Sequence, residues 1–132
     1  MSLGYSPKDI KLDGLAAISG IVTNQAISKD TGLTSGGALH LRVDIKVSGV
    51  TQVGTITAKL QHRAPNGSFE DLAGANASVT ITAAGIVTLT QLVERSADQA
   101  NMPIRKQLQV VLTTTNAGDA LTIDNIWIYQ EL

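Results

Sequence analysis

Histidine and carboxylate side chains are the groups in this sequence that could act as acids, bases or metal ligands. The chain has two histidines, His40 and His62, and no cysteine. His40 occupies a polar position of one alternating stretch, and His62 occupies an apolar position of the next. We therefore expect the two rings to point to opposite sides and not to share a metal ion. The sequence predicts no metal site.

The carboxylates do not form a pattern typical of catalysis. Glu70 and Asp71 are adjacent, so they would face opposite sides of a strand, while Asp119 and Asp124 have the positions of a turn residue and an outer-face residue. A glycosidase needs two carboxylates across a cleft, typically with aromatic side chains to hold the sugar, and only 3% of the residues are aromatic. GxSxG, HExxH, P-loop and Rossmann patterns are absent from the sequence. We predict no catalytic residue, no cofactor and no enzymatic activity.

The elements that would position these residues read as β-strands. Residues 39–47, LHLRVDIKV, alternate apolar and polar side chains without error, and residues 55–63 alternate in the same way. We expect these two stretches to pair through SGVTQVG. The polar side of the first stretch carries opposite charges two positions apart, at Arg42, Asp44 and Lys46, and we expect solvated pairs there that contribute little individually.

A turn and further strands follow. Pro-Asn-Gly at residues 65–67 predicts a hairpin corner in which Gly67 supplies a positive φ. Strands are expected over 76–83, 85–93, 105–115 and 120–132, with a bulge at Val110-Val111 and an alternation slip near Asn125. After that slip, Trp127 and Tyr129 would face away from Ile126 and Ile128. Residues 94–103 allow at most one helical turn before Pro103.

These strands predict an all-β fold, an antiparallel β-sandwich of jelly-roll type over residues 38–132. Residues 1–37 are interrupted by glycines and read as an extended amino-terminal arm with at most one short strand, at 18–27. The arm is too apolar for a solvated tail, so we expect it to lie against its own domain or against a neighbouring subunit. Its expected contact residues are Leu3, Tyr5, Ile10, Leu12 and Leu15.

Composition restricts the partners. The formal net charge is -1, from 10 basic and 11 acidic residues that are scattered along the chain, so direct binding to nucleic acid is not expected. No apolar run approaches the roughly 18 residues that a membrane helix needs, and the first residues lack a targeting pattern. We predict no membrane anchor and no small-molecule substrate.

Three phrases carry a resemblance to a known family. TITAKLQHRAPNGSFEDLAG, SVTITAAGIVTL and LQVVLTTTNAGDALTIDNIWI resemble the jelly-roll capsid cement (decoration) proteins of tailed bacteriophages. The resemblance implies a non-enzymatic virion protein, made in the host cytoplasm, that binds the outside of the major capsid protein lattice as a homo-oligomer, a dimer or a trimer. The arm, together with Asn66 and Gly67 of the corner, would supply the contacts.

An alternative interpretation is a carbohydrate-binding or host-contact β-sandwich module of a phage fibre or tail. The strand, turn and aromatic phrase around Phe69 also occurs in such sandwiches. This interpretation requires exposed aromatic side chains. We expect Phe69 and Trp127 to lie in the core instead, which makes the carbohydrate-binding module the second hypothesis.

Overall fold

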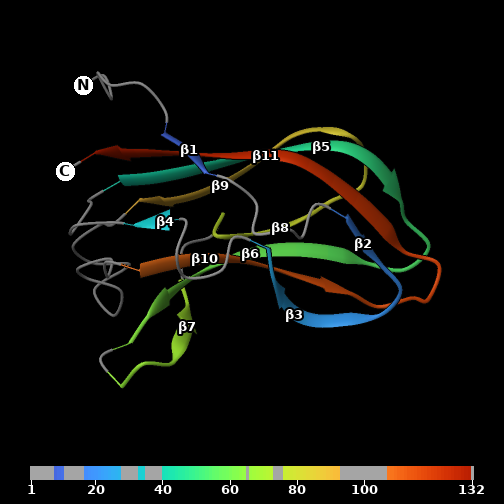
Figure 1. The fold of residues 1–132 in the computed structure, drawn as a ribbon, viewed down its shortest axis with the longest axis horizontal. Coiled ribbons are helices and arrows are strands. Elements are labelled where there is room, and N and C mark those ends of the chain that lie inside the picture. The colour runs from blue at the N-terminus through green and yellow to red at the C-terminus, as the bar shows by residue number, and fades with distance from the viewer. Residues whose placement is uncertain are drawn as a thin grey trace.

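A computed structural model describes residues 8–10, 17–27, 33–34, 40–64, 66–72, 76–92 and 107–131. In these residues the chain forms two antiparallel sheets packed face to face, a β-sandwich of jelly-roll type, as predicted (Figure 1). The described ranges contain strands but no helix, and hence no helix that could cross a membrane.

The first sheet, sheet A, contains the two longest strands. Its order is β1 (Lys8–Ile10), β11 (Ala120–Glu131), β5 (His40–Thr51) and β9 (Gly85–Leu92), and β2 (Ala17–Ser19) also pairs with β11. Figure 1 shows β11, β5 and β9 running together as one layer.

Sheet B forms the other layer, which Figure 1 shows below sheet A. Its order is β3 (Val22–Ala26), β10 (Gln107–Thr114), β6 (Ile56–Arg63) and β7 (Phe69–Asp71). Two short strands complete it, since β4 (Leu33–Thr34) pairs with β10 and β8 (Ser78–Thr80) pairs with β6.

The core lies between the sheets and is built from aliphatic side chains. The apolar positions of the two alternating stretches are buried as predicted, and in β6 every second residue, from Ile56 to His62, faces the core. Branched aliphatic residues suit this arrangement because their side chains pack well on a pleated surface. The cluster includes Leu41, Val43, Ile45, Val47, Leu60, Leu89, Leu108, Leu112, Leu121 and Ile126.

The predicted pairing of residues 39–47 with 55–63 is wrong. The first stretch belongs to β5 in sheet A and the second to β6 in sheet B, so the link between them crosses from one sheet to the other. The apolar sides of both stretches cover the same core in this arrangement, and they would also do so in a hairpin within one sheet. Residue alternation therefore does not distinguish a crossing between sheets from a hairpin. As a result, His40 and His62 lie in different sheets.

Asp119 joins the turn between β10 and β11 to the loop between β5 and β6. Its side chain is fully buried, and its Oδ1 accepts hydrogen bonds from the backbone N–H of Val53 and Gly54 at 2.7 and 2.8 Å. Its Oδ2 accepts from Thr115 and Asn116 at 3.2 and 3.0 Å. Burial acts to raise the pKa of this carboxyl, but the four backbone donors outweigh it and hold the pKa below the usual value. The predicted turn residue therefore also fixes the loop between β5 and β6.

The described part of residues 1–37 extends along its own domain. It contributes four short strands, two on β11 and two on β10, where one strand was predicted. Ile18 and Ile27 are buried in the core, and the Gly20 N–H donates to the Asp119 carbonyl at 2.9 Å. Of the two places left open for the arm, the described residues lie against their own domain, where they add strands to the edges of both sheets.

The two predicted irregularities have different outcomes. The slip near Asn125 is confirmed, because the pairing of β11 with β5 shifts register on both sides of Ile123. The bulge at Val110-Val111 is wrong, since β10 pairs with β6 in unbroken register there. Val111 is instead buried on the outer side, where it lies opposite Ala26 of β3. The segment 94–103 lies outside the described residues.

Candidate functional site

The outer side of sheet A gathers an unusual set of residues for a solvent-facing sheet. Register places Trp127 beside Asp44 and Tyr129 beside Arg42, and Thr88 lies beside Asp44 on its other side. These residues come from three neighbouring strands, β11, β5 and β9. We call this set, Arg42, Asp44, Thr88, Trp127 and Tyr129, the aromatic face.

An ion pair lies at the centre of the aromatic face. Arg42 Nε donates to Asp44 Oδ1 at 3.0 Å, and Arg42 Nη2 donates to Oδ2 at 3.0 Å. The Thr88 hydroxyl donates to Asp44 Oδ1 at 2.7 Å. Asp44 is only 4% exposed although it occupies a polar position of the alternation. The expectation that Asp44 is solvated is therefore wrong, because neighbouring side chains cover its carboxylate.

The other side of Arg42 faces an aromatic ring. Its guanidinium carbon lies 5.2 Å from the centroid of the Tyr129 ring, within the range of a cation–π interaction. The hydrogen bond to Asp44 raises the pKa of Arg42 above its usual value, so the side chain stays charged. The guanidinium is thus oriented by two partners while 44% of the Arg42 side chain remains exposed.

Trp127 and Tyr129 are half-buried on this face, whereas Ile126 and Ile128 point into the core. Their placement opposite the two isoleucines is confirmed. The expectation that Trp127 and Phe69 lie in the core is wrong, because both are half-buried. The slip near Asn125 explains why Trp127 faces outward, because it sets which residues at the end of β11 point away from the core.

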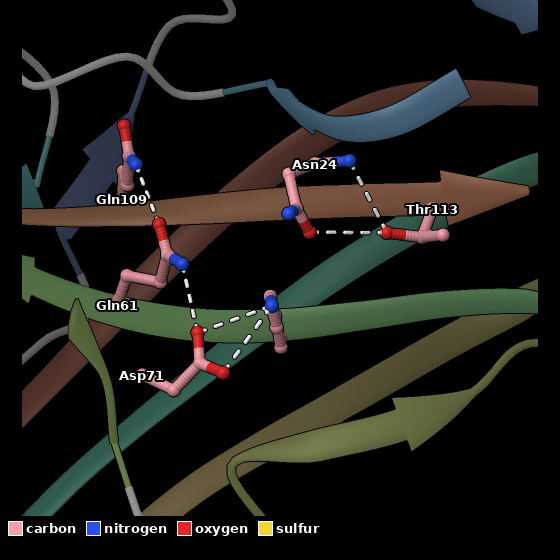
Figure 2. A network of polar contacts seen from close by, with 6 residues as sticks. Asn24, Gln61, Asp71, Gln109 and Thr113 are labelled. Atoms are coloured by element: carbon pink, nitrogen blue, oxygen red, sulfur yellow. Dashed lines mark hydrogen bonds and ion pairs between the residues drawn. The ribbon is translucent and has the colours of Figure 1, made fainter. Parts of the chain in front are cut away.

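The outer side of sheet B carries a different network, which Figure 2 shows from close by. Gln109 Nε2 donates to Gln61 Oε1 at 2.7 Å, and Gln61 Nε2 donates to Asp71 Oδ1 at 2.7 Å. Lys59 Nζ lies 3.1 Å from Asp71 Oδ1. We call these four residues, with Asn24 and Thr113 beside them, the polar face.

The carboxylate of the polar face is open to solvent. The Asp71 side chain is 59% exposed. Desolvation acts to raise its pKa, but the hydrogen bonds from Gln61 and Lys59 and the charge of Lys59 outweigh it, so the pKa lies below the usual value. This carboxylate stays ionised at neutral pH and has no character of a general acid.

The arrangement offers binding groups rather than reacting groups. Glu70 and Asp71 are adjacent on β7, Asp119 is enclosed by backbone donors, and Asp124 is exposed on β11. Among the residues that the structure describes, no three histidine or carboxylate side chains are grouped so that they could hold a metal ion.

None of the predicted contact residues belongs to the residue sets defined as the aromatic face and the polar face. Asn66 and Gly67 form the exposed corner between β6 and β7, where the Gly67 N–H donates to the Ala64 carbonyl at 2.9 Å and Gly67 has a φ of 92°. The corner interpretation of Pro-Asn-Gly is confirmed. Ile10 ends β1, whose side chains are not described, and Leu3, Tyr5, Leu12 and Leu15 lie outside the described residues.

Sequence reasoning missed the aromatic face as a unit. The positions of Trp127 and Tyr129 relative to Ile126 were visible as a period of two along the strand. Their position beside Arg42 and Asp44 was not visible, because those residues lie more than 80 positions away and are brought beside them only by the register of β11 on β5. A pairing of the last strand with residues 39–47 would have revealed the set.

No protein-family model matches this chain, and no curated protein matches it. Among solved structures, the chain is similar to a protein described as "xylan-binding module CBM15", with 15% sequence identity and a TM-score of 0.45. The match covers 98% of this chain and 100% of that one. At this TM-score and identity, the likeness bears on neither the site nor the function of this chain.

Proposed function

We propose that this chain is a non-enzymatic virion structural protein that stabilises a phage capsid by binding the outside of the major capsid protein lattice as a homo-oligomer. In this proposal the aromatic face is the lattice contact. The three sequence phrases that resemble capsid cement proteins support the capsid partner, and the rigid jelly-roll sandwich suits a protein that acts through a surface.

The observation that carries the proposal is the preformed group of Trp127, Tyr129 and Arg42 on one sheet surface. These three residue types are the ones enriched among the few hot-spot residues that dominate the binding energy of protein interfaces. Arg42 is already held by Asp44 and Tyr129 before any partner arrives, so its ordering costs less on binding. A specific interface commonly buries on the order of 1,200 to 2,000 Å² in total, and an open sheet surface can supply such an area without a pocket.

Co-sedimentation with phage heads tests the proposal. Purified protein is mixed with heads that have vacant lattice sites and separated on a gradient, and the heads are then challenged with heat and osmotic shock. We expect the protein to move with the heads and to raise their resistance. A double variant, Trp127→Ala with Tyr129→Ala, is expected to stay at the top of the gradient. Heads that neither bind nor gain resistance from the wild-type protein would contradict the proposal.

A second function is favoured by one observation, the partial exposure of Trp127 and Tyr129 on the same face. Two aromatic rings two residues apart on a strand, next to fixed polar groups, could also bind a carbohydrate, because aromatic side chains combine an apolar surface with polar contacts. This would make the chain a carbohydrate-binding or host-contact module of a fibre or tail. Titration calorimetry with host surface glycans tests it. Heat of binding that disappears in the same double variant, without binding to heads, would place this function first.

A further inference from the structure

Strand β9 forms one border of sheet A. In the sheet order β1, β11, β5, β9, it pairs with β5 along its full length of eight residues. On its other side, the described residues provide one backbone hydrogen bond, from the Thr90 N–H to the Asn76 carbonyl at 3.0 Å. The sequence of β9, GIVTLTQL, contains no charged residue and no proline.

The Thr90 bond shows which backbone groups of β9 point away from β5. In an antiparallel pair, residues alternate between those that bond across the pair and those whose N–H and C=O point outward. Because the Thr90 N–H bonds to Asn76, Thr88 and Ile86 belong to the same outward set. The Ile86 side chain is also 55% exposed, so this border presents both backbone groups and an apolar side chain.

The other sheet borders in the described chain are short or interrupted. β1, β2, β7 and β8 have three residues each and β4 has two, and β7 carries Glu70 and Asp71. β3 has five residues and meets β10 with a register shift. Short strands, charges and bulges are the features with which proteins prevent unwanted pairing at an edge. β9 has none of these three features. Among the described residues, Asn76 covers its edge only at Thr90, so Ile86 and Thr88 form the part of the edge that is available for pairing.

We propose that β9 pairs with β9 of a second copy of this chain, antiparallel across a two-fold axis at Val87. In this register Ile86 lies opposite Thr88 of the second copy, and the two residues exchange their outward backbone hydrogen bonds. The register leaves the Thr90–Asn76 bond intact. A second copy fits because a two-fold axis makes an uncharged strand complementary to itself, without like charges facing each other.

The pairing specifies the homo-oligomer of the proposed function, and the biological role of the dimer rests on that proposed function. It would join two copies of sheet A into one continuous sheet, with both aromatic faces on the same surface. Two contacts on one rigid unit bind a repeating lattice more tightly than one contact does, because the second binding event becomes intramolecular. The dimer itself requires no capsid.

Analytical ultracentrifugation of the purified protein over a range of concentrations tests the pairing. We expect a monomer–dimer equilibrium whose dissociation constant rises at least about tenfold in Ile86→Lys, since a charge on an edge strand opposes pairing. Ile21→Lys is the matched control, because Ile21 is 65% exposed in the turn between β2 and β3, away from this edge. A wild-type monomer at every concentration, a trimer, or a dimer equally strong in Ile86→Lys would overturn the proposal.

A cross-link tests the register. Because the chain has no cysteine, Val87→Cys introduces a single thiol. In the proposed register, residue 87 of one copy faces residue 87 of the other as a non-hydrogen-bonded pair. The Cα atoms of such a pair lie about 4.5 Å apart, a distance that a disulfide can span. We expect a covalent dimer on oxidation, and none from Ile21→Cys. A dimeric protein in which Val87→Cys does not cross-link would contradict this register. Heads are absent from both experiments, so a negative result here leaves binding of the monomer to the capsid as a separate question.

Discussion

The outer faces of the two sheets contain ion pairs of nearly equal length in different surroundings. On the aromatic face, Arg42 Nε and Asp44 Oδ1 are 3.0 Å apart, and the Asp44 side chain is 6% exposed. On the polar face, Lys59 Nζ and Asp71 Oδ1 are 3.1 Å apart, and the Asp71 side chain is 59% exposed. Exposed pairs are screened by water and contribute little. In the aromatic face the carboxylate is covered, so loss of its arginine would leave the Asp44 charge with little solvent.

The N–O distance alone therefore does not tell which of the two ion pairs contributes more to stability. In the aromatic face the covered Asp44 is bonded to Arg42, and Arg42 lies over the Tyr129 ring. In the polar face a chain of hydrogen-bonded side chains ends at the exposed carboxylate of Asp71. Under the proposed function we therefore expect the aromatic face, and not the polar face, to bind the partner.

The largest expected effect is on binding. Trp127→Ala should weaken binding to the capsid lattice by about 2 kcal/mol or more, roughly 30-fold in Kd, because a large aromatic contact is lost. Gln109→Ala on the polar face should change Kd by less than about twofold. Binding isotherms on heads measure both. If Gln109→Ala weakens binding and Trp127→Ala does not, the roles of the two faces are reversed.

The second largest expected effect is the difference in stability when the aspartate of each ion pair is removed. Asp44→Ala should lower the free energy of unfolding by about 1.5–3 kcal/mol, because it removes the partner of the Arg42 guanidinium and of the Thr88 hydroxyl. Asp71→Ala, the matched variant on the polar face, should cost less than about 1 kcal/mol. Urea denaturation followed by circular dichroism measures the difference. Equal costs would mean that burial does not separate the two pairs.

The corner beside the polar face is expected to have a smaller effect. Gly67→Val should lower the free energy of unfolding by about 1–2 kcal/mol, since Gly67 has a φ of 92° that a β-branched residue adopts only with strain. Binding to heads should not change, because the corner lies outside the aromatic face. Unchanged stability combined with lost binding would instead identify Asn66 and Gly67 as contact residues.

The smallest effect is the pH dependence of the polar face. The pKa of Asp71 is lower in the folded state than the usual value of an aspartate, so ionisation of this carboxyl favours folding. That contribution is complete above the unfolded pKa and is lost as the pH falls through the folded pKa. The stability difference between wild type and Asp71→Asn should therefore be largest above about pH 5 and shrink toward about pH 3. A difference that grows on acidification would contradict the direction of the shift.

Much of the fold could be predicted from the sequence. Alternation over 39–47 and 55–63 identified the strands and their buried sides, and the Pro-Asn-Gly turn identified the corner with its positive φ at Gly67. These features are local, because the period of side chains along a strand and the φ preference of glycine act over a few residues. The position of Trp127 and Tyr129 opposite Ile126 followed from the same period.

The partners of those strands could not be predicted in this way. Residues 39–47 were expected to pair with 55–63, but β5 pairs with β9 and β11, and β6 pairs with β10. Alternation states which side of a strand is apolar, but it carries no information on which other strand continues the sheet. The burial of Asp44 was missed for the same reason, since the Thr88 hydroxyl bonds to it and Trp127 lies opposite it in register, both from other strands.

The sequence by itself thus determined the all-β class, the buried side of each main strand and the turn at Gly67, because these depend on neighbouring residues. The tertiary structure decided three further features: the crossing from β5 to β6, the fixing of that loop by Asp119, and the assembly of the aromatic face. Each of them depends on hydrogen bonds or packing between residues far apart in the chain, and only the folded register brings those residues together.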